Sequence, residues 1–374
     1  MENIIFLTLD LVYPDDTGGR KLSLGRILHE QEKGSTVTVI HYNYKNQVDN
    51  DAKIFFKAKN ISFYSFSPSQ KNNGFGRLIA YAKSCIYKMP EPYFLINNDS
   101  RFKLFLDDKI QQIKPSLISM ESIFLASVSD FILNNKIKLN YTFHNVESDF
   151  YFSLYISETN KIKKIHYYIQ SLLLKVIEKN LFNLTGKITY TFLSKEDLNE
   201  YKKRYIINDN LCLINHNNIN ITKIINRKIN HIEPFFLFTG SLDFPANSFA
   251  IRKLLEYPGL DWTCVPKIVI TGSISEDIKK TFSCFENIYF AGRVSENELY
   301  ELFTTCVASI SPILTGGGIK IKNLEAIKLG VPLIATKFSC IGINTHSEKV
   351  ILTENDSVSF YNAMVGFYNN VCRS

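Results

Sequence analysis

The chain has 374 residues, enough for two domains at roughly 100–200 residues each. Hydrophobic residues make up 45% of it and charged residues 21%, which excludes disordered, collagen-like and disulfide-scaffold classes. The seven cysteines include no C-x-x-C pair, so we expect buried, reduced thiols rather than a zinc cluster or a redox motif.

The net charge of +7 is concentrated in the first half of the chain. Residues 1–195 contain 25 Lys and Arg against 18 Asp and Glu, whereas residues 196–374 contain 18 of each. This asymmetry predicts a negatively charged partner, such as a charged acceptor or an anionic membrane surface. A solvated basic face without a partner is the open alternative. A nucleic-acid partner is not expected, because no module for it is recognisable.

The N-terminal run MENIIFLTLD carries Glu2 and Asp10 where a secretory signal would be positively charged. No run approaches the roughly 18 apolar residues that span a bilayer. We therefore expect a cytoplasmic protein that is not integral to the membrane.

Short β-rich runs alternate with amphipathic stretches through the first half of the chain. A strand at 3–9, a helix at 19–33 and a strand at 36–41 predict a βαβ unit. A long helix is expected near 161–181, and Ser194 can N-cap a shorter one. Further strands are predicted at 61–66, 116–120, 139–143, 187–193 and 211–215.

The alternation restarts after a polar, basic linker at 219–232. Strands are predicted at 235–241, 267–272, 287–292, 306–311, 332–336 and 349–353. The pattern indicates an α/β protein of two doubly wound Rossmann-like domains, at 1–218 and 233–355, with a cleft between them. A last helix at 356–374 carries an apolar stripe and is expected to pack back on the N-terminal domain.

Two glycine-rich turns lie between a predicted strand and a predicted helix. Gly18 and Gly19 follow the first strand, and Gly316 to Gly318 follow the strand that ends at Ser311. Glycines let the backbone approach a ligand, and the following helix N-terminus attracts phosphate. The second turn could therefore hold a diphosphate, with Lys320 as the counter-charge. Neither turn is a dinucleotide fingerprint or a P-loop, and a purely structural turn remains open for the first.

Several segments together resemble retaining GT-B glycosyltransferases of family 4. The run GGGIKIKNLEAIKLGVPLIAT at 316–336 is similar to that family's nucleotide-sugar-binding segment, and GSLDFPAN at 240–247 to the start of its C-terminal half in one branch. Further similarities occur in the family's order: Gly18-Gly19, Pro92, Ser100, HNVE at 144–147, LSKEDLNEY at 193–201 and GRV at 292–294. They cover nearly the whole chain.

The resemblance implies an acceptor-binding N-terminal domain and a C-terminal domain that binds a nucleoside-diphosphate sugar. It implies that His144 contacts the donor hexose and that Glu325 binds the ribose hydroxyls; a structural role for each is the alternative. Together with Lys320 these are the expected catalytic residues. The other donor-binding residues it implies are Gly18, Gly19, Gly240, Ser241, Arg293, Gly316, Gly317, Gly318 and Ile319.

The chain departs from the family pattern at two places. Gly317 stands where many members have a second glutamate, and Gly240-Ser241-Leu242-Asp243 replaces the usual cation pair. Lys320, Lys322 and Arg293 are candidate substitutes. Lys320 is the expected phosphate contact, and Lys322, two residues on, is expected to point elsewhere around the helix.

The function that the resemblance implies is retaining transfer of a hexose from a nucleoside-diphosphate sugar, with UDP or GDP favoured. The acceptor would be a glycan or lipid-linked glycan in bacterial surface polysaccharide or glycolipid biosynthesis. No metal or other cofactor is expected. The enzyme would be cytoplasmic and peripheral at the inner face of the cell membrane. The alternative is a non-catalytic GT-B subunit that binds a glycan or an active transferase, which Gly317 and the missing cation pair favour.

Overall fold

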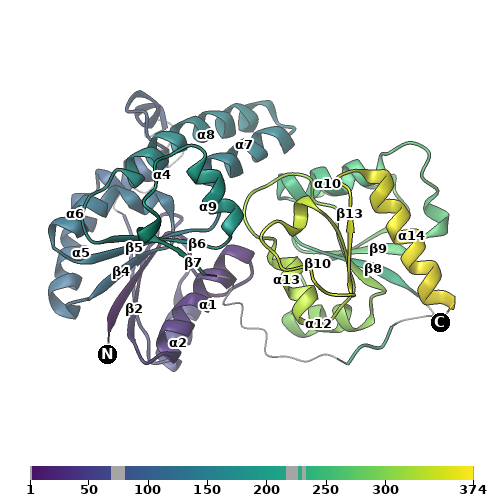
Figure 1. Ribbon diagram of the computed structural model, residues 1–374, viewed down its shortest axis with the longest axis horizontal. Helices are drawn as coiled ribbons and strands as arrows, with labels where there is room; N and C mark the ends of the chain where they lie inside the picture. Colours follow the sequence, from purple (N-terminus) through teal and green to yellow (C-terminus); the bar gives the residue numbers. More distant parts are fainter. Residues whose placement is uncertain (1, 69–80, 216–225, 230–232, 374) are drawn as a thin grey trace. The chain divides into compact units, whose positions relative to one another are not determined.

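The computed structural model describes residues 2–68, 81–215, 226–229 and 233–373. The chain divides into two compact units, one made of Met1–Tyr151 with Tyr168–Asn220, the other of Phe152–Tyr167 with Ile221–Ser374. Each unit contains one parallel sheet with helices on both faces (Figure 1). The two doubly wound domains are confirmed, and the second unit also takes in a segment that the boundary predicted at 218 assigns to the first.

The sheet of the first domain has seven strands, all parallel, in the order β3-β2-β1-β4-β5-β6-β7. Its strands are β1 (Asn3–Thr8), β2 (Thr36–Tyr42), β3 (Ser62–Phe66), β4 (Leu117–Met120), β5 (Lys138–Phe143), β6 (Ile188–Phe192) and β7 (Cys212–Ile214). All lie within one residue of the predicted bounds, because strands buried on both faces are continuous apolar runs. Along β1, Ile4 and Phe6 enter one core cluster, and Ile5 and Leu7 enter another.

The helices of this half of the chain include the three that the sequence predicts. Those with both ends among the described residues are α1 (Gly18–Glu32), α2 (Asn50–Ala58), α4 (Glu91–Asn97), α5 (Ser100–Ile113), α6 (Ser129–Asn134), α7 (Glu147–Ser157), α8 (Lys161–Phe182) and α9 (Lys195–Lys202), and residues 81–86 are helical as well. Ser194 Oγ accepts the backbone N–H of Asp197 at 3.0 Å, which confirms the predicted cap of α9.

The sheet of the second domain has six strands, all parallel, in the order β10-β9-β8-β11-β12-β13. Its strands are β8 (Phe235–Thr239), β9 (Lys267–Thr271), β10 (Ile288–Gly292), β11 (Ala308–Ser311), β12 (Leu333–Thr336) and β13 (Val350–Thr353). Its helices are α10 (Pro245–Leu255), α11 (Glu276–Thr281), α12 (Glu296–Thr305), α13 (Ile321–Lys328) and α14 (Ser357–Arg373). The predicted linker 219–232 lies outside the described residues except for 226–229, which form neither helix nor strand.

The last helix packs differently from the prediction. The apolar stripe of α14 is buried in the second domain, where the helix contacts α10, β12 and β13. Phe360 and Met364 lie in the core beside Leu254 of α10. The helix meets this core directly because it follows β13 after only a short turn.

The cysteines are also less buried than predicted. The six described ones are unpaired, but only Cys306 and Cys340 are buried. Cys264 ends a short 3-10 helix and Cys284 lies in a turn, so both are exposed outside the core strands.

Candidate functional site

Both sheets change winding direction at one point, and the predicted site residues follow the strands there. In the first sheet this point lies between β1 and β4, and in the second between β8 and β11. Ligands of open α/β sheets bind beyond the carboxyl ends of the strands at such a switch point. Gly18 and Gly19 follow β1, Gly240 and Ser241 follow β8, and residues 316–318 follow β11. The topology therefore brings the predicted donor-binding segments of the second domain to one edge of its sheet.

Three glycines end neighbouring strands of the second sheet with positive φ: Gly240 at +133°, Gly272 at +105° and Gly292 at +70°. A Cβ on Gly272 would lie 2.6 Å from the backbone nitrogen of Ser241, and Gly272 N donates to Gly292 O at 2.7 Å. The backbones are thus packed directly against each other. This edge of the sheet presents main chain rather than side chains.

The ammonium group nearest Gly240 belongs to Lys322. A Cβ on Gly240 would lie 3.0 Å from Lys322 Nζ and 2.9 Å from Asn247 Nδ2. Lys322 Nζ donates to Asn247 Oδ1 at 3.0 Å and stands 4.0 Å from the centroid of the Phe238 ring. Burial and the charge of Lys320, partly opposed by Glu325, together lower the pKa of Lys322 to about 7. An amine that an adjacent anion would keep protonated therefore lies at the carboxyl end of β8.

Lys320 makes its contacts within the glycine turn, and its predicted contact with phosphate stays a prediction. Its Nζ donates to the carbonyls of Gly317 and Gly318, at 3.1 and 2.8 Å. Lys320 is the N-cap residue of α13 and makes no side-chain capping bond, whereas the Lys322 ammonium lies beside Gly240 at the end of β8. The two lysines do point in different directions, but Lys322, expected to point away from the site, is the one beside Gly240.

The remaining predicted residues of this turn have distinct surroundings. Gly316 and Gly318 have φ of +116° and +64°, which side chains adopt only with strain, so two positions of the turn require glycine. Ile319 is buried, so it offers a ligand only its backbone. Glu325 is half-buried one turn along α13 from Lys322.

Ser241 and Arg293 lie at the same edge. Ser241 Oγ donates to Ser273 O at 2.7 Å, which joins the loops after β8 and β9. Asp243 Oδ1 accepts Ser275 N at 2.7 Å, and the hydrogen bonds of Ser275 together with the charge of Arg293 lower the pKa of Asp243 against the effect of burial. Arg293 thus borders the loop that begins at Gly240.

In the first domain, His144 is held by a buried carboxylate that sequence reasoning missed. Glu121, directly after β4, accepts His144 Nε2 at 3.2 Å and Arg26 Nε at 3.3 Å. Ser23 Oγ, Ser119 Oγ and Thr142 Oγ1 also donate to it.

The ionised state of Glu121 decides which His144 nitrogen carries the proton of their hydrogen bond. Burial alone would raise the pKa of Glu121, but the Arg26 charge and the His144 hydrogen bond outweigh it and lower that pKa to about 2. An ionised carboxylate only accepts, so His144 Nε2 carries the proton. His144 Nδ1 is buried and has no hydrogen-bond partner among the described residues.

The paired glycines begin α1, the helix that carries Ser23 and Arg26. Thr17 caps it by accepting Arg20 N at 3.4 Å, and a Cβ on Gly19 would meet nothing within 4 Å. Sequence position alone does not bring Ser23 and Arg26 of α1 to Glu121. The available signal is that Glu121 directly follows a predicted strand, where ligand-facing residues of parallel sheets concentrate.

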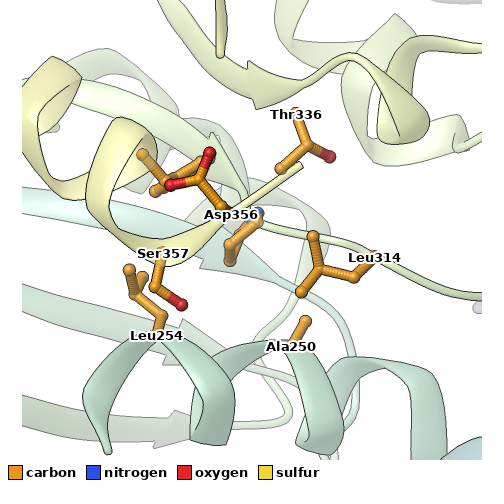
Figure 2. Close-up of a pocket in the computed structure, with 8 residues that line it drawn as sticks. Ala250, Leu254, Leu314, Thr336, Asp356 and Ser357 are labelled. Carbon is orange, nitrogen blue, oxygen red and sulfur yellow. The ribbon is translucent and has the colours of Figure 1, made fainter. Parts of the chain in front are cut away.

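A small hollow of the second domain lies between α10 and the start of α14 (Figure 2). Its labelled lining residues are Ala250, Leu254, Leu314, Thr336, Asp356 and Ser357. Ser357 Oγ donates to Lys253 O at 2.9 Å, which fixes the start of α14 to α10. The hollow is therefore a packing crevice of the second domain and holds none of the predicted donor residues.

Among the described residues, His, Cys, Asp and Glu nowhere gather in threes with the geometry of a metal site. Metal independence stays a prediction. In the described part of the chain, no helix combines the length and hydropathy needed to cross a bilayer.

Comparison with known proteins agrees with this architecture. Residues 233–370 match the family model described as glycosyl transferases group 1. An uncharacterized 44.6 kDa protein in the cps region of Klebsiella pneumoniae is 24% identical over 386 residues, covering 99% of this chain and 92% of that protein.

Two solved structures have a similar fold. Anabaena Alr3699/HepE, in complex with UDP and glucose, superposes with a TM-score of 0.62 at 12% identity, over 100% of this chain and 91% of its own. Sucrose-phosphate synthase from Thermosynechococcus elongatus superposes with a TM-score of 0.65 at 12% identity. The superposition covers 99% of this chain and 90% of the synthase chain. The chain has the two-domain, Rossmann-like GT-B fold.

Proposed function

We propose that this protein is a retaining glycosyltransferase of family 4 that moves a hexose from UDP- or GDP-activated sugar to a glycan or lipid-linked glycan. The observation that carries the proposal is the Lys322 ammonium beside Gly240, at the switch point of the domain that matches group 1 glycosyltransferases. The cps-region relative supports a role in bacterial surface polysaccharide or glycolipid biosynthesis.

The second domain would hold the donor by its diphosphate. The glycine turn places the N-terminus of α13 beside the end of β8, and backbone N–H groups at a helix N-terminus bind anions. Lys322 adds a charge-assisted hydrogen bond, which is stronger than a neutral one. These groups stabilise the diphosphate as it departs, where the negative charge of the transition state collects. Glu325 would accept the ribose hydroxyls, and no metal takes part in this proposal.

The first domain would contact the transferred sugar. Glu121 holds the His144 ring through Nε2 and so fixes its orientation directly after β5, where the ring would contact the sugar. Arg26 keeps Glu121 ionised, so it is a positioning residue. The anomeric configuration would be retained by front-side attack, in which the departing phosphate takes the acceptor's proton.

Donor binding and donor hydrolysis test the proposal. Melting temperature is measured with UDP, GDP and their sugars, and release of free nucleotide is followed over time with Lys322→Met as the inactive reference. We expect one nucleotide series to stabilise the protein and its sugar to be slowly hydrolysed. Stabilisation without turnover, even with glycan acceptors, would favour the non-catalytic GT-B subunit; no shift with any nucleotide would refute the donor site.

A further inference from the structure

Helix α8 is apolar on two sides. One side packs in the core of the first domain through Leu174, Ile177 and Leu181. The opposite side exposes large apolar groups to solvent: Ile162 (81% exposed), Ile165 (61%), Tyr168 (43%), Leu172 (45%) and Val176 (44%). A helix that is apolar all round is normally buried on every side.

These five residues form one continuous strip. They are spaced three or four positions apart, so they lie one above another along the helix for about 21 Å. We call them the α8 strip. No other helix in the described part of the chain exposes more than two large apolar side chains. The neighbouring helix α7, which a short turn joins to α8, exposes two large apolar side chains, Phe152 and Ile156 (Figure 1). Contiguous apolar patches of this kind mark interaction surfaces.

The charges of α8 are positive on the side that faces solvent. The helix contains lysines at 161, 163, 164, 175 and 179, and its single acidic residue is Glu178. The Glu178 carboxylate points into the protein, where it accepts Ser148 N at 2.8 Å and Tyr205 Oη at 3.0 Å. Lysine side chains of α8 therefore lie beside the strip, and no carboxylate of this helix faces solvent there.

We propose that the α8 strip docks the protein on an anionic lipid membrane. An apolar helix face with lysines beside it lies in the bilayer interface, where apolar side chains enter the headgroup region and ammonium groups meet lipid phosphates. Lysine stems can follow the apolar surface while their charges remain in water. A single convex helix face offers no groove for a peptide, whereas a fluid lipid surface can adapt to it. Docking itself is argued from α8 alone. Only its purpose, access to a lipid-linked acceptor, rests on the proposed function.

Vesicle co-sedimentation of the full chain tests this surface. Vesicles of pure phosphatidylcholine are compared with vesicles of equal parts phosphatidylcholine and phosphatidylglycerol, at low and high salt. The strip variant combines Ile165→Ser with Leu172→Ser. Its matched control combines Ile54→Ser on α2 with Leu104→Ser on α5, the same residue types at more exposed positions. The charge variant combines Lys175→Gln with Lys179→Gln. Its matched control combines Lys57→Gln with Lys138→Gln, two exposed lysines outside α8.

Wild type should sediment with anionic vesicles, more weakly at high salt. The strip and charge variants should each lower the partition coefficient about tenfold. Both controls should bind like wild type, and equal melting temperatures show that the variants are folded.

Absent binding to anionic vesicles, or equal binding by the strip variant, would overturn the proposal. Light scattering reveals the other occupant: a dimer that the strip variant dissociates, without vesicle binding, would assign the strip to a second copy. Nucleotide-induced stabilisation, measured on the same samples, separates this inference from the donor site. The rise in melting temperature with nucleotide should be unchanged in the strip variant. If wild type shows no such rise, the donor site is refuted, but the vesicle result still holds.

Discussion

Replacing Lys322 by methionine removes the ammonium group beside Gly240 and over the Phe238 ring while keeping most of the apolar stem of the side chain. A hydrogen bond from a charged group contributes about 1.5–3 kcal/mol, and about 1.4 kcal/mol corresponds to tenfold in affinity. Lys322→Met should therefore weaken binding of the nucleotide sugar about ten- to hundredfold. The matched control is Lys328→Met, at an exposed position of the same helix.

The pH dependence of binding gives a second, independent measure of Lys322. Its pKa of about 7 in the free protein should rise when a diphosphate binds, because the anion stabilises the ammonium. Between the free and bound pKa values, binding takes up one proton, so affinity should fall about tenfold per pH unit above pH 7. The diphosphate of a nucleotide sugar is esterified on both phosphorus atoms and keeps a constant charge in this range.

Isothermal titration of the stabilising nucleotide sugar at several pH values measures both effects. Wild type and Lys328→Met should show the decline above pH 7, and Lys322→Met should bind weakly with a flat profile. If Lys320→Met is damaging while Lys322→Met binds normally, the assignment of the phosphate contact to Lys322 is wrong. A pH slope that persists in Lys322→Met would show that another group takes up the proton.

Three further outcomes are expected. Glu325→Ala should lower nucleotide affinity about ten- to hundredfold, with Glu325→Gln less affected, in a thermal-shift titration; lower melting temperature at unchanged affinity would indicate a structural role instead. Because the pKa of Glu121 is lowered from 4.5 to about 2, its ionisation stabilises the fold above pH 4.5 by about 3 kcal/mol, which is lost as pH falls toward 2. Urea unfolding at pH 7 and pH 3 should show about 2 kcal/mol of this loss in wild type, and Glu121→Gln should lack that part of it. Donor hydrolysis should persist in excess EDTA; complete loss with rescue by Mn²⁺ or Mg²⁺ would contradict a metal-independent mechanism.

The strands could be predicted because their evidence is local. Each β-strand of both sheets is a short apolar run between polar turns, so residue order alone indicates where it lies. The glycine turns were also visible, since consecutive glycines stand out in any sequence. The positive φ of Gly316 and Gly318 is the physical reason why glycine stands at these two positions.

The partners of the site residues could not be predicted, because they depend on which strands are neighbours. Glu121 and His144 are 23 positions apart and meet only because β4 pairs with β5. The choice between Lys320 and Lys322 depends on where α13 begins. Lys320 is its cap and folds onto the preceding carbonyls, whereas Lys322 lies within the first turn and reaches Asn247.

The packing of α14 determines where the polypeptide can be cut in experiments on isolated halves. A fragment that ends at residue 355 would leave out Phe360 and Met364, which fill the core of the second domain. Such a fragment would expose the apolar faces of β12 and α10 and should aggregate, whatever the condition of its nucleotide-binding loops. A fragment that runs from residue 233 through Arg373 keeps these contacts. Loss of nucleotide binding in the shorter piece would then report a missing part of the core rather than a missing contribution from the first domain.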